Sequence, residues 1–143
     1  EFCMTAMHET GSLLHSVVAQ LTKAGIAHYV LGDGRIRVPR PNDFGELEIG
    51  AINTAGPDSI VGLVGHSWHT HGDVLSAENG GAGHVGGIVQ FVRDIFAGRY
   101  LLIAETMLGK SARKTIVRDL DRYLDHLPDG ATYKIYNGRD SAD

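Results

Sequence analysis

The chain has 143 residues, of which 43% are hydrophobic and 21% charged, a size and composition typical of a single globular domain. The formal net charge of -4 argues against a nucleic-acid binder that is held by phosphate contacts. No run of about 18 apolar residues occurs, so we expect no transmembrane helix and no membrane partner. No signal peptide is visible either.

The amino terminus resembles a cloning remnant, because Glu1, Phe2 and Cys3 precede Met4. We therefore expect residues 1–3 to lie outside the fold and residues 4–143 to form a single globular domain. Cys3 is the only cysteine, so no internal disulfide can form. This composition fits a reducing compartment and predicts a cytoplasmic location.

The first strong periodicity predicts a helix over residues 8–24, which ends at Gly25. Its apolar stripe consists of Leu13, Leu14, Val17, Val18 and Leu21. Residues 28–31 and 35–38 then flank the turn sequence 32–34, and this pattern predicts a β-hairpin. Alternation in the second strand gives that strand one basic face and one apolar face.

The hydrophobic pattern predicts four further strands and two further helices. The strands are expected at 46–49, 60–65, 100–104 and 131–136, and the helices at 85–96 and 111–127. Residues 76–87 hold five glycines and are expected to form a loop. The predicted fold is therefore α+β, a mostly antiparallel sheet with helices packed on it, in the order α-β-β-β-β-α-β-α-β.

The densest group of chemically active side chains lies in the segment from Gly65 to Asp73. Four of the eight histidines fall between residues 66 and 84. If the strand from Ile60 continues to His71, His69 and His71 lie on one face, about 7 Å apart at Cα. His66 and Trp68 then point to the other face. This pattern predicts a binding surface that includes Trp68, His66, His69, His71, Asp73, Glu78 and His84.

The same side chains include a candidate metal site. Imidazoles at the spacing of His69 and His71 can converge on one ion, and Asp73 can join them if the chain stays extended. A tetrahedral zinc site needs three or four N, O or S ligands, so the segment supplies an incomplete set. Ordinary surface histidines and an ordinary core tryptophan explain the same residues without any ligand.

Residues 64–71, which end in His69-Thr70-His71, resemble the metal-binding strand of JAMM/JAB-type zinc isopeptidases. That resemblance implies a zinc-dependent hydrolase that uses the His69/His71 pair. Three departures count against it: Gly72 replaces the family's proline, residues 76–79 lack the ligand aspartate, and residues 28–31 lack the general-base glutamate. A zinc ion that lacks its third ligand and its base is a poor hydrolase.

A wider part of the chain is similar to small bacterial domains of the immunity-protein type. The opening helix, the strand at 47–49, the strand into Trp68-His69-Thr70-His71 and the segment 91–100 carry this resemblance. It implies a cytoplasmic protein that neutralises a cognate toxin by direct binding, without a cofactor. Trp68 would then be an aromatic anchor. Candidates to meet a basic toxin surface are Asp33, Asp43, Glu46 and Glu48.

These patterns favour a protein-binding domain over an enzyme. The zinc-dependent hydrolase stays open as the alternative, with zinc as its cofactor and His69, His71 and Asp73 as its ligands. The two hypotheses assign the same segment to different chemistry: Trp68 would anchor a partner, whereas His69 and His71 would hold a metal ion.

Overall fold

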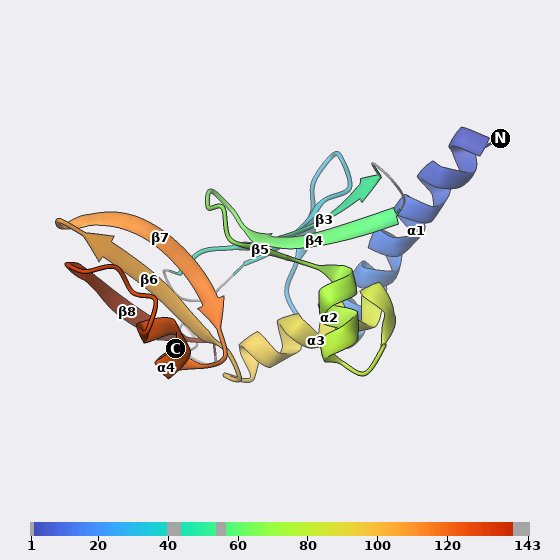
Figure 1. Cartoon of the computed structure of the whole chain (residues 1–143). Coiled ribbons are helices and arrows are strands. Elements are labelled where there is room, and N and C mark those ends of the chain that lie inside the picture. Colours follow the sequence, from blue (N-terminus) through green and yellow to red (C-terminus); the bar gives the residue numbers. More distant parts are fainter. Residues whose placement is uncertain (1, 40–43, 54–56, 139–143) are drawn as a thin grey trace. The chain divides into compact units, whose positions relative to one another are not determined.

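The computed structural model describes residues 2–39, 44–53 and 57–138. The chain forms two compact units, Glu1–Pro39 with Glu46–Arg93 and Arg40–Gly45 with Asp94–Asp143. Each unit contains one antiparallel sheet (Figure 1), so the predicted α+β class is confirmed. All the predicted helices and strands occur in the predicted order, and three further elements lie among them.

The first unit holds a five-stranded sheet and its helices. In chain order its elements are α1 (Phe2–Lys23), β1 (Tyr29–Val30), β2 (Ile36–Val38), β3 (Leu47–Asn53), β4 (Pro57–Leu63), β5 (His69–His71), α2 (Gly72–Glu78) and most of α3 (Gly83–Phe96). Each strand is antiparallel to the next, in the order β1-β2-β3-β4-β5. Helix α1 includes Phe2 and Cys3, which were expected to precede the fold, and Glu1 lies outside the described residues.

The two faces of the five-stranded sheet differ in burial. The face that we call the inner face is formed by the buried residues Ile36, Val38, Leu47, Ile49, Val61 and Leu63. The apolar stripes of α1 and α3 complete this core with Val17, Leu21, Ile88 and Val92, which are fully buried. The opposite, outer face carries Arg37, Glu48, Ile60, Gly62, His69 and His71, all exposed or half-buried. Alternation along each strand therefore produces one apolar and one polar face.

The hairpin around Asp33 forms as the sequence predicts. The Leu31 amide donates to the Arg35 carbonyl at 2.8 Å, and Gly34 has a φ of +93°, which favours glycine. Ile36 and Val38 are fully buried, whereas Arg37 is half-buried on the outer face. The predicted division of this strand into a basic and an apolar face is thus confirmed.

The expectation of one strand from Ile60 to His71 is wrong. Strand β4 ends at Leu63, and the chain turns back so that β5 pairs antiparallel with β4. Gly65 has a φ of +81°, and the Leu63 amide bonds to the Trp68 carbonyl at 3.3 Å across the turn. His66 and Trp68 therefore lie in a turn, to which the alternation of a strand does not apply.

The glycine-rich segment 76–87 is mostly helical and is not the expected loop. Helix α2 ends at Glu78, α3 begins at Gly83, and only residues 79–82 lie between them. A Cβ atom on Gly87 would lie 2.6 Å from the Ser76 amide nitrogen, so this glycine allows α3 to approach α2 closely. Here glycine permits close helix contact and tight turns.

The second unit holds a three-stranded sheet in the order β7-β6-β8, formed by β6 (Leu101–Met107), β7 (Lys110–Val117) and β8 (Ala131–Asn137). The helix expected over 111–127 is shorter than predicted. Its first half is β7, which contains the β-branched run 115–117, and only α4 (Leu120–Leu124) is helical. Asp119 caps α4 by accepting from the Arg122 amide. None of the helices in the described part of the chain combines the length and hydropathy that a membrane crossing requires.

Candidate functional site

A hollow of about 570 Å³ lies on the outer face of the five-stranded sheet. Strands β2 and β3 with the preceding turn contribute Arg35, Arg37, Glu48 and Gly50, and β4 contributes Ile60 and Gly62. The turn between β4 and β5 and the start of β5 contribute His66, Ser67, Trp68 and His69. Gly50 and Gly62 leave the centre of the face without side chains, so the larger side chains around them enclose a space.

Ion pairs neutralise much of the charge beside this hollow. The Glu48 carboxylate accepts from Arg35 at 2.8 Å and from Arg37 at 2.7 Å, and Asp33 accepts from Arg35 at 2.7 Å. Tyr29 donates to both oxygens of Glu46 at 2.9 Å. The acidic residues expected to meet a basic toxin are therefore engaged on their own surface, and Asp43 lies outside the described residues.

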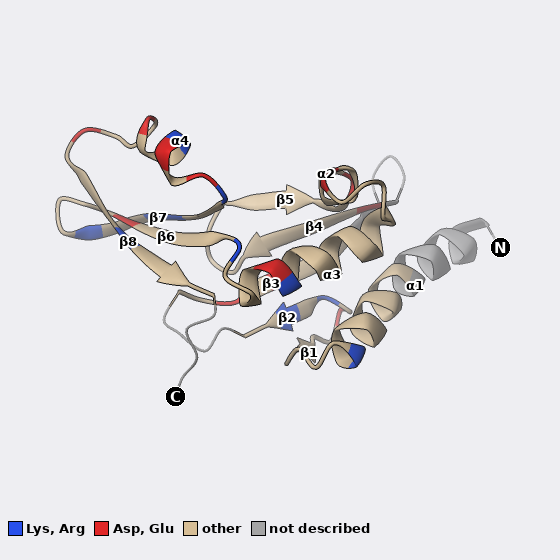
Figure 2. Cartoon of the chain, turned by 90° about the horizontal axis from the view of Figure 1, so that it is seen from below, with Lys and Arg blue, Asp and Glu red and all other residues tan. Residues whose placement is uncertain are grey.

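Charges of both signs are interspersed along the ribbon. Figure 2 shows a basic segment on β2, an acidic segment on α2 and both signs on α4. Basic and acidic residues therefore both occur in each unit of the described chain.

Trp68 is half-buried and contributes to the fold as well as to the hollow. Its ring stacks on Phe91 of α3 with centroids 6.0 Å apart and planes at 17°. Its carbonyl accepts the hydrogen bond that closes the turn. Because truncation of Trp68 would remove this stacking contact, the variant Trp68→Ala cannot separate a binding role from a structural one.

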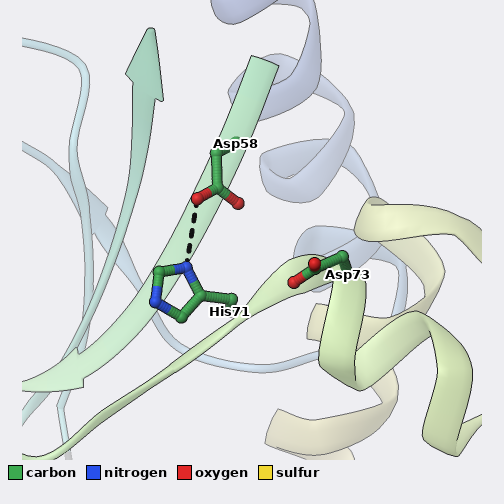
Figure 3. Close-up of side chains that lie close together, drawn as sticks. All are labelled: Asp58, His71 and Asp73. Atoms are coloured by element: carbon green, nitrogen blue, oxygen red, sulfur yellow. Dashed lines mark hydrogen bonds and ion pairs between the residues drawn. The ribbon is translucent and has the colours of Figure 1, made fainter. Parts of the chain in front are cut away.

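A second feature of the outer face is a group of three potential metal ligands, Asp58, His71 and Asp73 (Figure 3). One ligand atom from each residue lies within 4.8 Å of the other two. The pairing of β4 with β5 brings Asp58 next to His71, whose Nδ1 lies 3.1 Å from Asp58 Oδ2. Asp73 follows two residues later at the start of α2, and its carboxylate is turned toward the pair.

The hydrogen bonds of Asp58 favour its ionised form. Burial raises the pKa of this carboxyl, but hydrogen bonds from the Ser59 amide and from His71 outweigh burial and hold the pKa below its usual value. The Ser59 amide donates to Oδ1 at 2.8 Å, which leaves Oδ2 facing His71. Asp58 is therefore a carboxylate near neutral pH, which is the form that binds a cation.

The predicted histidine pair does share one face. His69 and His71 pair with Gly62 and Ile60 of β4, and their ring centroids lie 5.2 Å apart. His69 Nδ1 lies 2.9 Å from the Ser67 carbonyl oxygen, and its ring lines the hollow. His69 is not part of the three-residue group, in which Asp58 accompanies His71 and Asp73.

Two other predicted site residues lie elsewhere in the first unit. Glu78 is exposed at the end of α2 and does not belong to the three-residue group. His84 returns to this region from α3, but its Nδ1 lies 2.8 Å from the hydroxyl of Ser59, which is fully buried. His84 therefore supports β4 behind the group.

Gly72 connects two members of the group through a very confined space. A Cβ atom at this position would lie 1.9 Å from Ser59 Oγ and 2.7 Å from His84 Nδ1. Only glycine allows the chain to pass here while the Ser59–His84 contact remains in place. The contact thus fixes the positions of His71 and Asp73 on either side of Gly72.

Sequence reasoning missed Asp58. This residue stands 13 positions before His71 in the chain, and only the register of β4 against β5 brings the two together. The usable signal was alternation, because Asp58, Ile60 and Gly62 must share one face of a strand. No protein-family model, curated protein or solved structure matches this chain.

Proposed function

We propose that this chain is a bacterial, cytoplasmic protein-binding domain whose contact surface is the outer face of the five-stranded sheet. Its partner is a toxin of the kind that immunity-type domains neutralise. The hollow beside Arg37, Glu48 and His69 carries this proposal. A hollow of this size falls within the range of about 300–1,000 Å³ seen for ligand pockets, and it accepts one or two side chains from a protein partner.

The surroundings of the hollow support a macromolecular partner. Tyr29 lies directly opposite Arg37 in the register of β1 and β2, and its side chain is 42% exposed. Val64 in the turn is also exposed. Aromatic and arginine side chains are enriched at protein interfaces, and both types occur here beside a space that a partner's side chain can fill.

A pair of glycine variants tests this surface. Gly50 lies in the hollow, has a φ that any residue adopts, and would meet only the Arg35 side chain at 3.7 Å. Gly50→Phe therefore fills the hollow with little strain. The matched control is Gly32→Phe, because Gly32 also has an unrestricted φ, has open space around it and does not line the hollow.

The assay is protection of growing cells from the protein encoded immediately upstream of this chain, with co-purification as a second readout. The wild-type chain and Gly32→Phe should protect and co-purify, and Gly50→Phe should do neither. The proposal fails if the wild-type chain forms no complex, or if Gly50→Phe binds as well as the wild type while it remains folded by circular dichroism.

A zinc-dependent hydrolase of the JAMM/JAB-like type is the second candidate, and one observation favours it. Asp58 and Asp73 place carboxylates beside His71, which adds to the incomplete ligand set of the His69/His71 pair. Asn79 occupies the position of the family's aspartate, and its amide donates to the Leu75 carbonyl. The residues therefore do not reproduce the family's metal site, and we derive no catalytic step from it.

Activity would separate the two candidates. Glu48 pairs with Gly62 in the register of β3 and β4, and Gly62 pairs with His69 in the register of β4 and β5. Glu48 is therefore the carboxylate of the hollow that a hydrolase would use as its general base. Zinc-dependent cleavage of an isopeptide-linked substrate that Glu48→Gln abolishes would establish the enzyme. Full protection from the toxin by the wild-type chain in the presence of a zinc chelator would favour the binding protein.

A further inference from the structure

We propose that Asp58, His71 and Asp73 form a binding site for one divalent transition-metal ion of the Zn²⁺ class. The site differs from the set His69, His71 and Asp73 that the sequence suggested, because it uses Asp58 in place of His69. It depends on neither candidate function, since an ion here can be structural, can bridge to a partner or can activate water.

The distances fit one small ion. Two ligand atoms bound to one tetrahedral zinc at bond lengths of about 2.1 Å lie about 3.4 Å apart. His71 Nδ1 and Asp58 Oδ2 are already 3.1 Å apart, and no pair within the group exceeds 4.8 Å. To bring its oxygen to zinc-binding distance, the side chain of Asp73 must rotate toward the ion, which it can do because it is exposed.

Backbone hydrogen bonds engage one oxygen of each carboxylate and leave the other for the ion. The Ser59 amide holds Asp58 Oδ1 at 2.8 Å, and the Val74 amide holds Asp73 Oδ1 at 2.8 Å. Asp58 Oδ2 then faces His71. Within the described part of the chain, no arginine or lysine forms an ion pair with either carboxylate. Two nearby carboxylates that lack an arginine or lysine partner repel each other, and a bound cation removes this repulsion.

The scaffold behind the group is rigid. The His84–Ser59 contact of 2.8 Å fills the space beneath Gly72, and Ser59 is fully buried. The three ligands come from β4, the end of β5 and the start of α2, and this contact ties β4 to α3 directly behind Gly72, which connects β5 to α2. Because Asp58 and His71 are already positioned, binding an ion orders chiefly the side chain of Asp73.

The donor set selects the class of metal. One imidazole nitrogen and two carboxylate oxygens suit Zn²⁺ and neighbouring transition metals, whereas Ca²⁺ prefers six to eight oxygens and Mg²⁺ prefers water-rich oxygen shells. Three protein ligands leave at least one position for water or for a partner's side chain. Because His71 contacts His69 edge to face at 5.2 Å, and His69 lines the hollow, the proposed site lies close to the proposed contact surface.

Isothermal titration of ZnCl₂ into the metal-free, untagged full chain tests this site. The test variants are Asp58→Asn and Asp73→Asn, which keep the size of each side chain and remove its charge. His69→Asn is the matched control, because His69 lies on the same face and outside the group. Circular dichroism of each variant checks the fold, and Asp73→Asn at an exposed position keeps the test valid if Asp58→Asn does not fold.

The wild-type chain and His69→Asn should each bind one Zn²⁺, and equimolar Mg²⁺ should not compete. Either aspartate variant should lose more affinity than the about 10–100-fold that the loss of an outer hydrogen-bond partner costs. The proposal is overturned if the folded aspartate variants bind Zn²⁺ like the wild type. It is equally overturned if the wild type binds no Zn²⁺, or if His69→Asn alone removes binding.

Discussion

The two units of this protein each contain a carboxylate with hydrogen-bonding partners, and the two carboxylates differ in how completely they are satisfied. In the second unit, Glu105 is 3% exposed and accepts from Arg113 at 2.6 Å and from Tyr123 at 2.5 Å. In the first unit, the side chain of Asp58 is 36% exposed, and it faces a histidine and a second carboxylate.

This difference distinguishes a structural network at Glu105 from a candidate binding site at Asp58. Glu105 is buried with a cation and a hydroxyl donor directed at it, so its charge is compensated within the fold. Asp58 and Asp73 lie near the surface with His71, and one potential ligand atom of each residue lies within 4.8 Å of the other two. A buried, saturated network stabilises a unit, whereas an open and incompletely compensated group is available to a ligand.

The largest expected effect concerns Gly72, which lies between two members of the group of Asp58, His71 and Asp73 (the open group). Gly72→Ala would place a Cβ atom 1.9 Å from Ser59 Oγ, so β4, α2 or α3 must shift. We expect a loss of about 3 kcal/mol in the free energy of unfolding, measured by urea denaturation. Gly32→Ala, which meets no atom within 4 Å, should change stability little. An equal loss in both variants would show that the Ser59–His84 contact does not confine the chain at Gly72.

The next largest effect is expected in the network of Glu105, Arg113 and Tyr123 (the saturated network). Tyr123→Phe keeps the edge-to-face contact with Tyr133, with ring centroids 6.0 Å apart, and removes one donor to the buried Glu105. We expect a loss of about 1–3 kcal/mol in the free energy of unfolding. Tyr133→Phe, at a half-exposed ring, is the control and should cost less.

Alkaline pH sharpens this prediction. Burial and the Glu105 carboxylate raise the pKa of Tyr123 well above its usual value. A raised pKa in the folded state gives stability that is complete below the unfolded pKa of about 10 and is lost as pH rises beyond it. Unfolding titrations above that pH should show a smaller loss of stability in Tyr123→Phe than in the wild type. The same loss in both proteins would contradict the assigned role of Tyr123.

The smallest effect on stability is expected at the open group. Asp58→Asn should cost less than about 1 kcal/mol at neutral pH, because exposed ion pairs contribute little. Since the pKa of Asp58 is lowered in the folded state, its contribution is present above the unfolded value of about 3.9 and is lost as pH falls below it. Acid denaturation measures how the free energy of unfolding of Asp58→Asn depends on pH, with Asp129→Asn at an exposed position as the control. If Asp58→Asn lost as much stability at neutral pH as Tyr123→Phe, Asp58 and Glu105 would not differ in the way described.

Local patterns predicted much of this fold. The stripe of α1, the hairpin around Asp33 and the apolar strands followed from spacing alone, because burial imposes those periods on the sequence. The error at β7 arose because Ile116 and Val117 fit a helical stripe as well as a strand, and only the pairing of β7 with β6 decides between them. The glycines of 76–87 were interpreted as a loop because close packing of α2 on α3 leaves no local signal.

The candidate site was predicted in part for the same reason. His69 and His71 share a face because they are two residues apart, and a sequence shows that directly. Asp58 joins His71 only through the reversal of the chain at Gly65, which sets the register of β5 on β4. Contacts between distant residues depend on turns and register, and a single sequence specifies those less clearly than it specifies periodicity.

We propose that this chain binds a ligand at the group of Asp58, His71 and Asp73, and not at the network around Glu105. Two-dimensional ¹H–¹⁵N NMR during titration with Zn²⁺ distinguishes the two locations. We expect one equivalent to shift the amide signals of Ser59 and of residues 71–74 and to leave those of Glu105, Arg113 and Tyr123 unchanged. Shifts centred on the network, or spread over the exposed histidines without saturation at one equivalent, would contradict it.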